Sequence, residues 1–262
     1  TYVDMVHTGL SAYDLSSVRL WFNGGDAAHE IHIRALLAAG HRHVRFVDGM
    51  GSSEMGFSLF RHVHTRDSDH YQRCVGKPLP WVQAEVLDEK GRAVPLLTVG
   101  RLGVRAPSVT RGYWNDCNRT FKSRLGGYFL TGDLVYRDAE GFFYHVDRVT
   151  DPIVRNGETI YTLQTEERLM SQMPMISDCT IAPVLDDEDL EAGQNGRKAR
   201  VIAYLRPGQK HKADDLLSAA NAVLQESIMP VMDRFDVVDP RTIPLGTTGK
   251  VLKRVLRESS AT

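Results

Sequence analysis

The segment PLGTTGK, residues 244–250, gathers two glycines, two threonines and a lysine, which are residue types that suit a loop around phosphate. A Walker A loop has the pattern G-x-x-x-x-G-K-[ST], in which the hydroxyl after the lysine binds Mg²⁺. Here Pro244 takes the place of the first glycine, and Val251 follows Lys250. The segment is therefore not a Walker A loop, and its lysine must serve another kind of site.

The composition restricts the class of protein that carries this segment. The chain has 262 residues, of which 42% are hydrophobic and 25% charged, as in an ordinary globular protein. The net charge of −1 offers no basic surface for nucleic acid, and no apolar run approaches the roughly 20 residues of a membrane span. The three cysteines have neither disulfide nor zinc spacing, so we expect a cytoplasmic protein.

The hydrophobic pattern changes twice along the chain, which predicts three parts. Residues 17–60 alternate apolar strands with a helix over 29–40, as at the end of an α/β subdomain, here 1–74. Residues 75–149 hold short strands separated by turns, which predicts a small antiparallel β-barrel-like subdomain. Residues 150–262 mix helices and strands in a compact α+β domain, so the chain is multi-domain, of α/β and α+β class.

Within the last part, residues 213–228 have apolar side chains at helical spacing. Such spacing predicts an amphipathic helix that packs one face against its own domain. The expected buried face consists of Leu216, Ala220, Val223, Leu224 and Ile228.

Two pairs of histidines have H-x-H spacing, namely His41 with His43 and His62 with His64. On a strand, this spacing places both imidazoles on one face, which is one way to begin a metal site. No cluster of cysteines or carboxylates accompanies either pair in the sequence. Surface histidines are therefore the simpler interpretation.

Five segments resemble the adenylate-forming enzymes, the superfamily of acyl- and aryl-CoA synthetases, peptide-synthetase adenylation domains and luciferases. The longest is GYFLTGDLVYRDAEGFFYHVDRVTDPIVRNGETIY, residues 127–161. NGGD at 23–26 is similar to the glycine turn beside the acyl pocket, and MGSSEMG at 50–56 to the aromatic-Gly-x-Thr-Glu loop. PSVTRGYWND at 107–116 is similar to a stretch of the CoA-ligase branch, and IPLGTTGKVLKRVLRE at 243–258 to the C-terminal lysine loop.

The resemblance implies that a carboxylic acid is activated by ATP as acyl-AMP, and that the acyl group then passes to the thiol of CoA or of a carrier protein's phosphopantetheine. A carboxylate that attacks an α-phosphate brings two anions together, so cations must neutralise the developing charge. Lys250 resembles the lysine that reaches both groups, which gives PLGTTGK its role. The resemblance also implies that residues 150–262 form a mobile domain, hinged at Thr150.

The same resemblance implies where nucleotide and metal bind. Asp133 matches the carboxylate that accepts the ribose hydroxyls, and Arg148 matches an arginine that contacts ribose or phosphate. Glu54 matches the glutamate that binds Mg²⁺, a hard cation that prefers carboxylate oxygen. The other residues implied are Met50, Gly51, Ser52 and Ser53 at the nucleotide, Gly157 on the path of the thiol, and Gly24, Gly25, Asp26 and Gly49 at the acyl pocket. Taken singly, Asp133 would be read as a hairpin-turn residue and Arg148 as half of a surface ion pair.

The chain departs from the family pattern in ways that bear on activity. The Ser/Thr/Gly-rich phosphate loop that precedes the glycine turn in the family is not in this sequence, so we expect the chain alone to adenylate poorly. Met50 replaces an aromatic residue that stacks on adenine, and Thr150 stands where the hinge residue is usually Asp or Lys. Three alternatives stay open: the C-terminal part of an acid–CoA ligase, a truncated non-catalytic nucleotide-binding remnant, or one half of a split ligase. The partner would be the missing half or a second copy, and the sequence does not identify the acid.

Overall fold

The structure is a computed structural model whose contacts divide the chain into two compact units. One unit comprises Tyr2 and Gly9–Thr150, and the other comprises Thr1, Val3–Thr8 and Asp151–Thr262. The borders predicted for the subdomains at 1–74 and 75–149 stay predictions. The residues that the structure describes are 2–7, 9–25, 28–184, 198–206, 208–209 and 211–239, with the single positions 242, 244, 246, 252 and 255.

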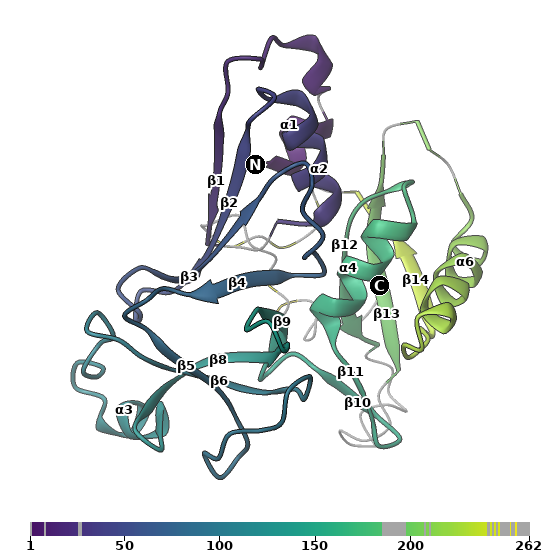
Figure 1. Ribbon diagram of the computed structural model, residues 1–262. Coiled ribbons are helices and arrows are strands. Elements are labelled where there is room, and N and C mark those ends of the chain that lie inside the picture. The colour runs from purple at the N-terminus through teal and green to yellow at the C-terminus, as the bar shows by residue number, and fades with distance from the viewer. Residues whose placement is uncertain are drawn as a thin grey trace. The chain divides into compact units, whose positions relative to one another are not determined.

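The first unit begins with a parallel strand pair joined by a helix (Figure 1). Strand β1 (Leu20–Gly24) pairs in parallel with β2 (Arg45–Gly51), and α2 (Glu30–Ala39) connects them. The apolar residues of α2 recur at helical spacing, and Gly40 caps the helix after Ala39, at the glycine stop that the sequence predicted. The helix buries its apolar side, and its Leu36 carbonyl accepts a hydrogen bond of 3.0 Å from Nε1 of Trp21 on β1.

The strands of this unit form one nine-stranded sheet, antiparallel except for the β1–β2 pair, in the order β1-β2-β3-β4-β9-β8-β6-β5, with β7 beside β8. The predicted barrel-like closure is wrong for the described residues, because β1 and β5 are the two open ends of this sheet. The remaining strands are β3 (Ser58–His64), β4 (Cys74–Pro78), β5 (Gln83–Leu87), β6 (Gly100–Arg105), β7 (Arg124–Leu125), β8 (Tyr128–Arg137) and β9 (Phe143–Arg148).

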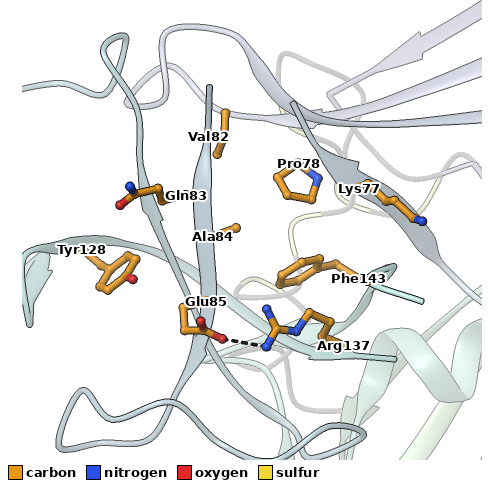
Figure 2. Close-up of a pocket in the computed structure, with 10 residues that line it drawn as sticks. Lys77, Pro78, Val82, Gln83, Ala84, Glu85, Tyr128, Arg137 and Phe143 are labelled. Carbon is orange, nitrogen blue, oxygen red and sulfur yellow. Dashed lines mark ion pairs between the residues drawn. The ribbon is translucent and has the colours of Figure 1, made fainter. Parts of the chain in front are cut away.

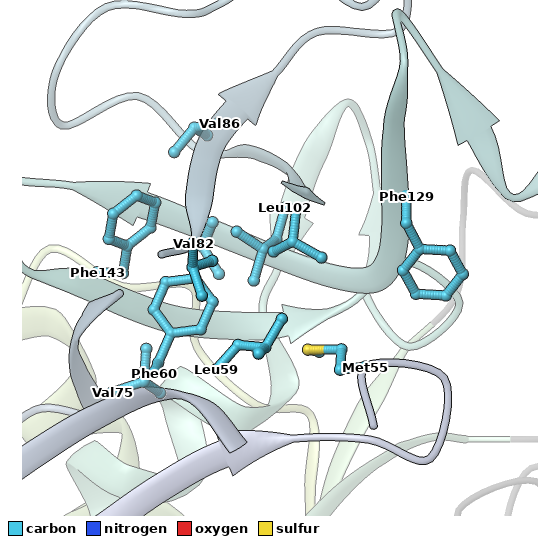
Figure 3. Packing of buried hydrophobic residues seen from close by; sticks show 11 residues of the cluster. Met55, Leu59, Phe60, Val75, Val82, Val86, Leu102, Phe129 and Phe143 are labelled. Carbon is cyan, nitrogen blue, oxygen red and sulfur yellow. The ribbon is translucent and has the colours of Figure 1, made fainter. Parts of the chain in front are cut away.

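A single apolar cluster joins the end of the parallel pair to the antiparallel strands (Figure 3). Phe60 on β3 meets Phe143 on β9 with ring centroids 5.2 Å apart, in an edge-to-face arrangement that aromatic pairs favour. Met55, in the loop after β2, is 1% exposed in the same cluster. The loop that carries the Glu54 motif is thus anchored in the core of the unit.

The second unit is an α+β module in which two helices pack against a three-stranded sheet (Figure 1). Strand β12 (Ile176–Pro183) pairs antiparallel with β13 (Ala199–Leu205), which pairs in parallel with β14 (Arg234–Val237). Helix α4 (Thr162–Gln172) contacts β12, and α6 (Ala213–Glu226) contacts β14 and α4. A separate hairpin of β10 (Ile153–Arg155) and β11 (Glu158–Ile160) opens the module.

Helix α6 confirms most of the buried face that the sequence predicted. Leu216, Ala220 and Leu224 are buried, and Val223 is partly buried. Ile228 was assigned to this face wrongly, because the helix ends at Glu226 and the Ile228 side chain is 96% exposed, with a backbone φ of 56°. The change of backbone conformation breaks the helical period that the pattern had assumed.

Three short elements complete the described structure: α1 (Tyr2–His7), a 3₁₀ turn (Leu10–Ala12) and α3 (Cys117–Lys122). Asp116 caps α3 by accepting a 2.8 Å hydrogen bond from the Arg119 amide, a common way to satisfy the first turn of a helix. Among the described residues, no helix is both long enough and apolar enough to cross a membrane.

Candidate functional site

Asp133 and Arg148 face each other across the hairpin formed by β8 and β9. They are register partners, and Nη1 of Arg148 lies 2.5 Å from Oδ1 of Asp133. The Asp133 side chain is 5% exposed, whereas that of Arg148 is 53% exposed. Because Asp133 lies inside a strand, the turn-residue interpretation is wrong, and the ion pair has one buried and one half-exposed end.

A third residue, His145 on β9, completes this group. Its Nε2 lies 3.3 Å from Oδ1 of Asp133. Burial raises the pKa of Asp133, but the hydrogen bond from His145 and the nearby charge of Arg148 outweigh this effect and lower it to about 2. The carboxylate is therefore ionised at neutral pH. His145 lies within the matched segment 127–161, but the resemblance gives it no role, and only the pairing of β8 with β9 brings it to Asp133.

The Glu54 loop leaves β2 through two tight turns. The Met55 amide donates to the Ser52 carbonyl at 3.1 Å, and the Gly56 amide donates to the Ser53 carbonyl at 3.1 Å. A Cβ placed on Gly51 would lie 2.4 Å from the Phe57 carbonyl oxygen and 2.6 Å from the Ser58 Cα. Only glycine fits there, because both neighbouring atoms belong to the backbone, at Phe57 just before β3 and at Ser58, the first residue of β3.

We expect Gly51→Ala to destabilise the first unit by about 1–3 kcal/mol, since backbone must move to admit the methyl group. The matched control is Gly24→Ala, whose new Cβ would meet its nearest atom at 3.5 Å, an ordinary contact. Urea unfolding followed by tryptophan fluorescence measures both variants. Equal midpoints for the two variants would show that the crowding at Gly51 is relieved without cost.

Glu54 is held by a segment more than fifty residues further along the chain. Its Oε1 accepts a 3.1 Å hydrogen bond from the Tyr113 hydroxyl and lies 4.0 Å from Nη2 of Arg119. Its own backbone amide lowers the pKa of the Glu54 carboxyl; burial opposes this, and hydrogen bonds from Tyr113 and Ser52 reinforce it. Two of the matched sequence segments, 50–56 and 107–116, therefore meet at an ionised carboxylate.

The predicted acyl-pocket glycines lie near the carboxyl ends of β1 and β2: Gly24 is the last residue of β1, and β2 continues beyond Gly49 to Gly51. Gly24 and Gly49 are register partners, and Nδ2 of Asn23 donates a 2.8 Å hydrogen bond to Oδ1 of Asp48 just before them. Ligands of α/β sheets bind beyond this carboxyl edge. Gly25 has a φ of 107°, which a residue with a Cβ rarely adopts. Asp26 lies outside the described residues.

Met50 is the register partner of Phe60 and packs, partly buried, against the apolar cluster. Its predicted contact with adenine stays a prediction, as do those of Ser52 and Ser53. The predicted site residues of the first unit thus form three groups: Asp133 with Arg148, the loop that carries Glu54, and the glycine edge, which consists of Gly24, Gly25 and Gly49.

Gly157 belongs to the second unit, in the turn between β10 and β11. Asn156 and Gly157 have φ values of 52° and 83°, the left-handed pair that a two-residue hairpin turn requires. A Cβ on Gly157 would meet no atom of the described residues within 4 Å. Lys250 lies outside the described residues, so its role stays a prediction.

Neither the histidine pairs nor the hollow beside β5 forms a second candidate. In the described part of the chain, no three His, Cys, Asp or Glu side chains are arranged to hold a metal ion. His62 and His64 share a face but are buried, with ring centroids 3.9 Å apart, so the surface interpretation is wrong for them. The hollow drawn in Figure 2 has a volume of about 560 Å³, and Glu85 and Arg137 form an ion pair in its lining, with Oε1 and Nη2 3.2 Å apart. No residue predicted for the site lines it.

Comparisons with known proteins agree with the geometry. The family model described as AMP-binding enzyme matches residues 2–114. The 3-aminoavenalumate diazotase of a Streptomyces species is 40% identical over 283 residues, which cover 100% of this chain and 51% of the relative. The long-chain-fatty-acid–CoA ligase of Bacillus subtilis is 29% identical over 98% of this chain and 44% of its own length. The chain belongs to the AMP-binding enzyme superfamily. The family predicted from the motifs is confirmed.

This AMP-binding enzyme chain aligns with the C-terminal half of the superfamily's acyl-CoA ligases and adenylation enzymes. The anthranilate CoA ligase AuaEII, solved in complex with anthranoyl-AMP, matches it with a TM-score of 0.82 at 23% identity. That match covers 98% of this chain and 48% of the solved chain, and it shows a shared fold. The chain spans about half the length of the curated relatives it matches, at 51% and 44%.

Proposed function

We propose that this chain carries the ribose-binding and lysine-bearing part of an enzyme that joins a carboxylic acid to ATP and passes the acyl group to a thiol. One observation carries the proposal. Arg148 and His145 both contact Oδ1 of Asp133, and within the described residues no group bonds Oδ2. An ionised aspartate offers acceptors only, so Oδ2 suits a ribose hydroxyl.

The remaining groups fit the same reaction. The ionised Glu54 is a suitable ligand for Mg²⁺, which would neutralise phosphate charge when bound. Gly24 and Gly49 pair near the carboxyl ends of two parallel strands, the edge at which α/β sheets bind ligands, so the acid would bind there. Gly157, with open space around its Cα, would let the arm of CoA or of a carrier protein pass. Residues 150–262 would act as the mobile domain that brings Lys250 and Gly157 to the site in turn.

A second candidate function concerns the acceptor. The relative with 40% identity is named a diazotase of an amino compound, whereas the relative with 29% identity is named a CoA ligase. Diazotisation of an amine consumes nitrite, an oxyanion that an adenylating site would activate as it does a carboxylate. Pyrophosphate release that depends on nitrite and an aryl amine, and not on a carboxylic acid with CoA, would favour this candidate.

The direct test is AMP binding by the 262-residue chain. We expect Asp133→Asn to weaken AMP binding by about 2 kcal/mol, or roughly 30-fold, because a charged acceptor is lost. Asp67→Asn, an exposed aspartate of the same unit, is the matched control and should bind AMP as the wild type does. Isothermal titration calorimetry gives the dissociation constants, and circular dichroism shows whether each variant is folded.

AMP binding that is equal in wild type and Asp133→Asn would contradict the proposed ribose contact.

A second experiment tests the truncated-remnant alternative. The chain is mixed with the N-terminal half of a relative as a separate polypeptide, and ATP, acid and CoA are then supplied. Restored pyrophosphate release favours a split or incomplete ligase, whereas AMP binding without any turnover favours the remnant.

A further inference from the structure

Arg73 is a buried cation whose position calls for an explanation. It is 8% exposed, and within the described residues no carboxylate lies at ion-pair distance. Its Nη2 lies 3.4 Å from Nδ1 of His145, and its Nε is buried without a hydrogen-bond partner among those residues. Buried arginines are almost always paired, so the contact with a neutral ring nitrogen stands out.

The backbone conformation at this point is also unusual. Gln72 and Arg73 have φ values of 56° and 64°, a left-handed conformation that is uncommon for residues with a Cβ. The Arg73 carbonyl accepts a 3.1 Å hydrogen bond from the His145 amide, so the two residues are joined through the main chain as well. Such backbone outliers are concentrated at functional sites.

The contacts of His145 select one tautomer of its ring. A guanidinium can only donate, so Nδ1, which faces Arg73, must accept and carries no proton. The proton is then on Nε2, which lies 3.3 Å from Oδ1 of Asp133 and 3.1 Å from the Asp147 carbonyl oxygen. Both of these partners are acceptors, so every contact of the ring agrees with the Nε2–H form.

The charged groups around the ring favour its neutral form. Burial lowers the pKa of His145; the hydrogen bond to Asp133 opposes this, and the charges of Arg73 and Arg148 reinforce it. These groups come from three places, namely the turn before β4, strand β8 and strand β9 itself. A proton on Nδ1 would face the donors of Arg73 and break the contact.

We propose that Arg73 and His145 are positioning residues of the nucleotide site: Arg73 fixes the tautomer of His145, and His145 holds Oδ1 of Asp133 so that Oδ2 is presented to the ribose. This inference rests on the proposed function, since the ribose gives Oδ2 its purpose. The two residues touch no reacting atom. They act by orienting the one carboxylate oxygen that must accept from a hydroxyl.

The tautomer is measured directly by long-range ¹H–¹⁵N NMR of the full chain labelled with ¹⁵N-histidine. His145→Gln identifies the His145 resonances among those of the ten histidines. We expect the wild type to show the Nε2–H form, Arg73→Lys to keep it because lysine also donates, and Arg73→Leu to populate the Nδ1–H form. A wild type in the Nδ1–H form, or an unchanged tautomer in Arg73→Leu, would overturn the inference.

AMP binding separates positioning from simple structural support. Gln places an amide N–H where His145 has its Nε2–H, whereas Leu has no donor, so we expect His145→Gln to bind AMP within about threefold of wild type and His145→Leu to lose about tenfold. Arg73→Leu should weaken binding in the same direction. The control, His43→Leu, changes an exposed imidazole outside the site and should bind as wild type does.

The outcomes distinguish this inference from the proposed function. If Asp133→Asn weakens AMP binding as expected but His145→Leu does not, the positioning role fails and the function stands. Equal losses in His145→Gln and His145→Leu, with equal losses of stability, also overturn the positioning role. If AMP does not bind to the wild type, the positioning role and the proposed function fail together, and the NMR result still decides the tautomer.

Discussion

Replacing His64 with phenylalanine should remove a large part of the acid sensitivity of the unit formed by Tyr2 and Gly9–Thr150. His64 is 1% exposed, and neither ring nitrogen has a hydrogen-bond partner among the described residues. Burial lowers its pKa to about 3, and the charges of His62, His70 and Arg34 act in the same direction. In the unfolded chain, a histidine titrates near 6.5.

The sign of the effect follows from proton linkage. Between these two pKa values the unfolded chain binds a proton at His64 and the folded chain does not, so stability falls as the pH falls from about 6.5 towards 3. At pH 5, the pH difference of about 1.5 from the unfolded value corresponds to about 2 kcal/mol of lost stability. Phenylalanine cannot take up a proton, and it keeps the ring that stacks on Tyr71 with centroids 5.1 Å apart.

The measurement is urea unfolding at pH 7.5 and pH 5.0. All three tryptophans, Trp21, Trp81 and Trp114, belong to this unit, so their fluorescence reports its unfolding alone. The wild type should lose about 2 kcal/mol more than His64→Phe between the two values. His43→Phe, which replaces an exposed imidazole of the same unit, should behave as wild type does. Identical pH dependence in wild type and His64→Phe would contradict the burial of an uncharged His64.

The parts of the fold that the sequence predicted well are those set by local patterns. Helix α2 stops before its capping residue Gly40, and the strands around Asp133 and Arg148 lie where alternating apolar residues placed them. Local spacing decides such elements, because one buried face repeats every 3.6 or 2 residues. The pattern failed where the backbone changed conformation, as at Ile228 with its φ of 56°.

The candidate site was predictable only as far as its motifs reach. Glu54, Asp133 and Arg148 stand in recognisable segments with an implied role, whereas Arg73 lies outside all of them and His145 lies in segment 127–161 without an implied role. The contact between Arg73 and His145 joins positions 72 residues apart and depends on β4 pairing with β9. The burial of His64 likewise follows from cross-strand packing beside Phe46 and Tyr71. Pairing between distant strands cannot be read from a single pattern of residues.

In an enzyme that combines this chain with the phosphate loop of its relatives, Lys250→Ala should slow adenylation by about 10²–10³, or 3–4 kcal/mol. The expected reason is the loss of a cation that bridges the attacking carboxylate and the α-phosphate. Pyrophosphate exchange measures this step. Lys253→Ala, three residues further along the same segment, is the matched control and should leave the exchange rate near that of the wild type.

A substitution at Gly157 in the second unit should slow transfer to the thiol and leave adenylation unchanged, which is the reverse of the effect expected for Lys250→Ala. Asparagine tolerates the φ of 83° at Gly157, but its side chain would lie on the proposed path of the thiol. In Gly157→Asn, thioester formation from synthetic acyl-AMP should therefore slow by about tenfold, while the rate of pyrophosphate exchange should stay the same. Gly208→Asn is the matched control, because Gly208 has the same φ of 83° and, among the described residues, likewise no atom within 4 Å of an added Cβ. Lys250→Ala should spare this second step, since the acid is already activated when the thiol attacks. If Lys250→Ala slows both steps equally, PLGTTGK does not act in adenylation alone. If Gly157→Asn and Gly208→Asn have the same rates, the β10–β11 turn does not act in thiol transfer.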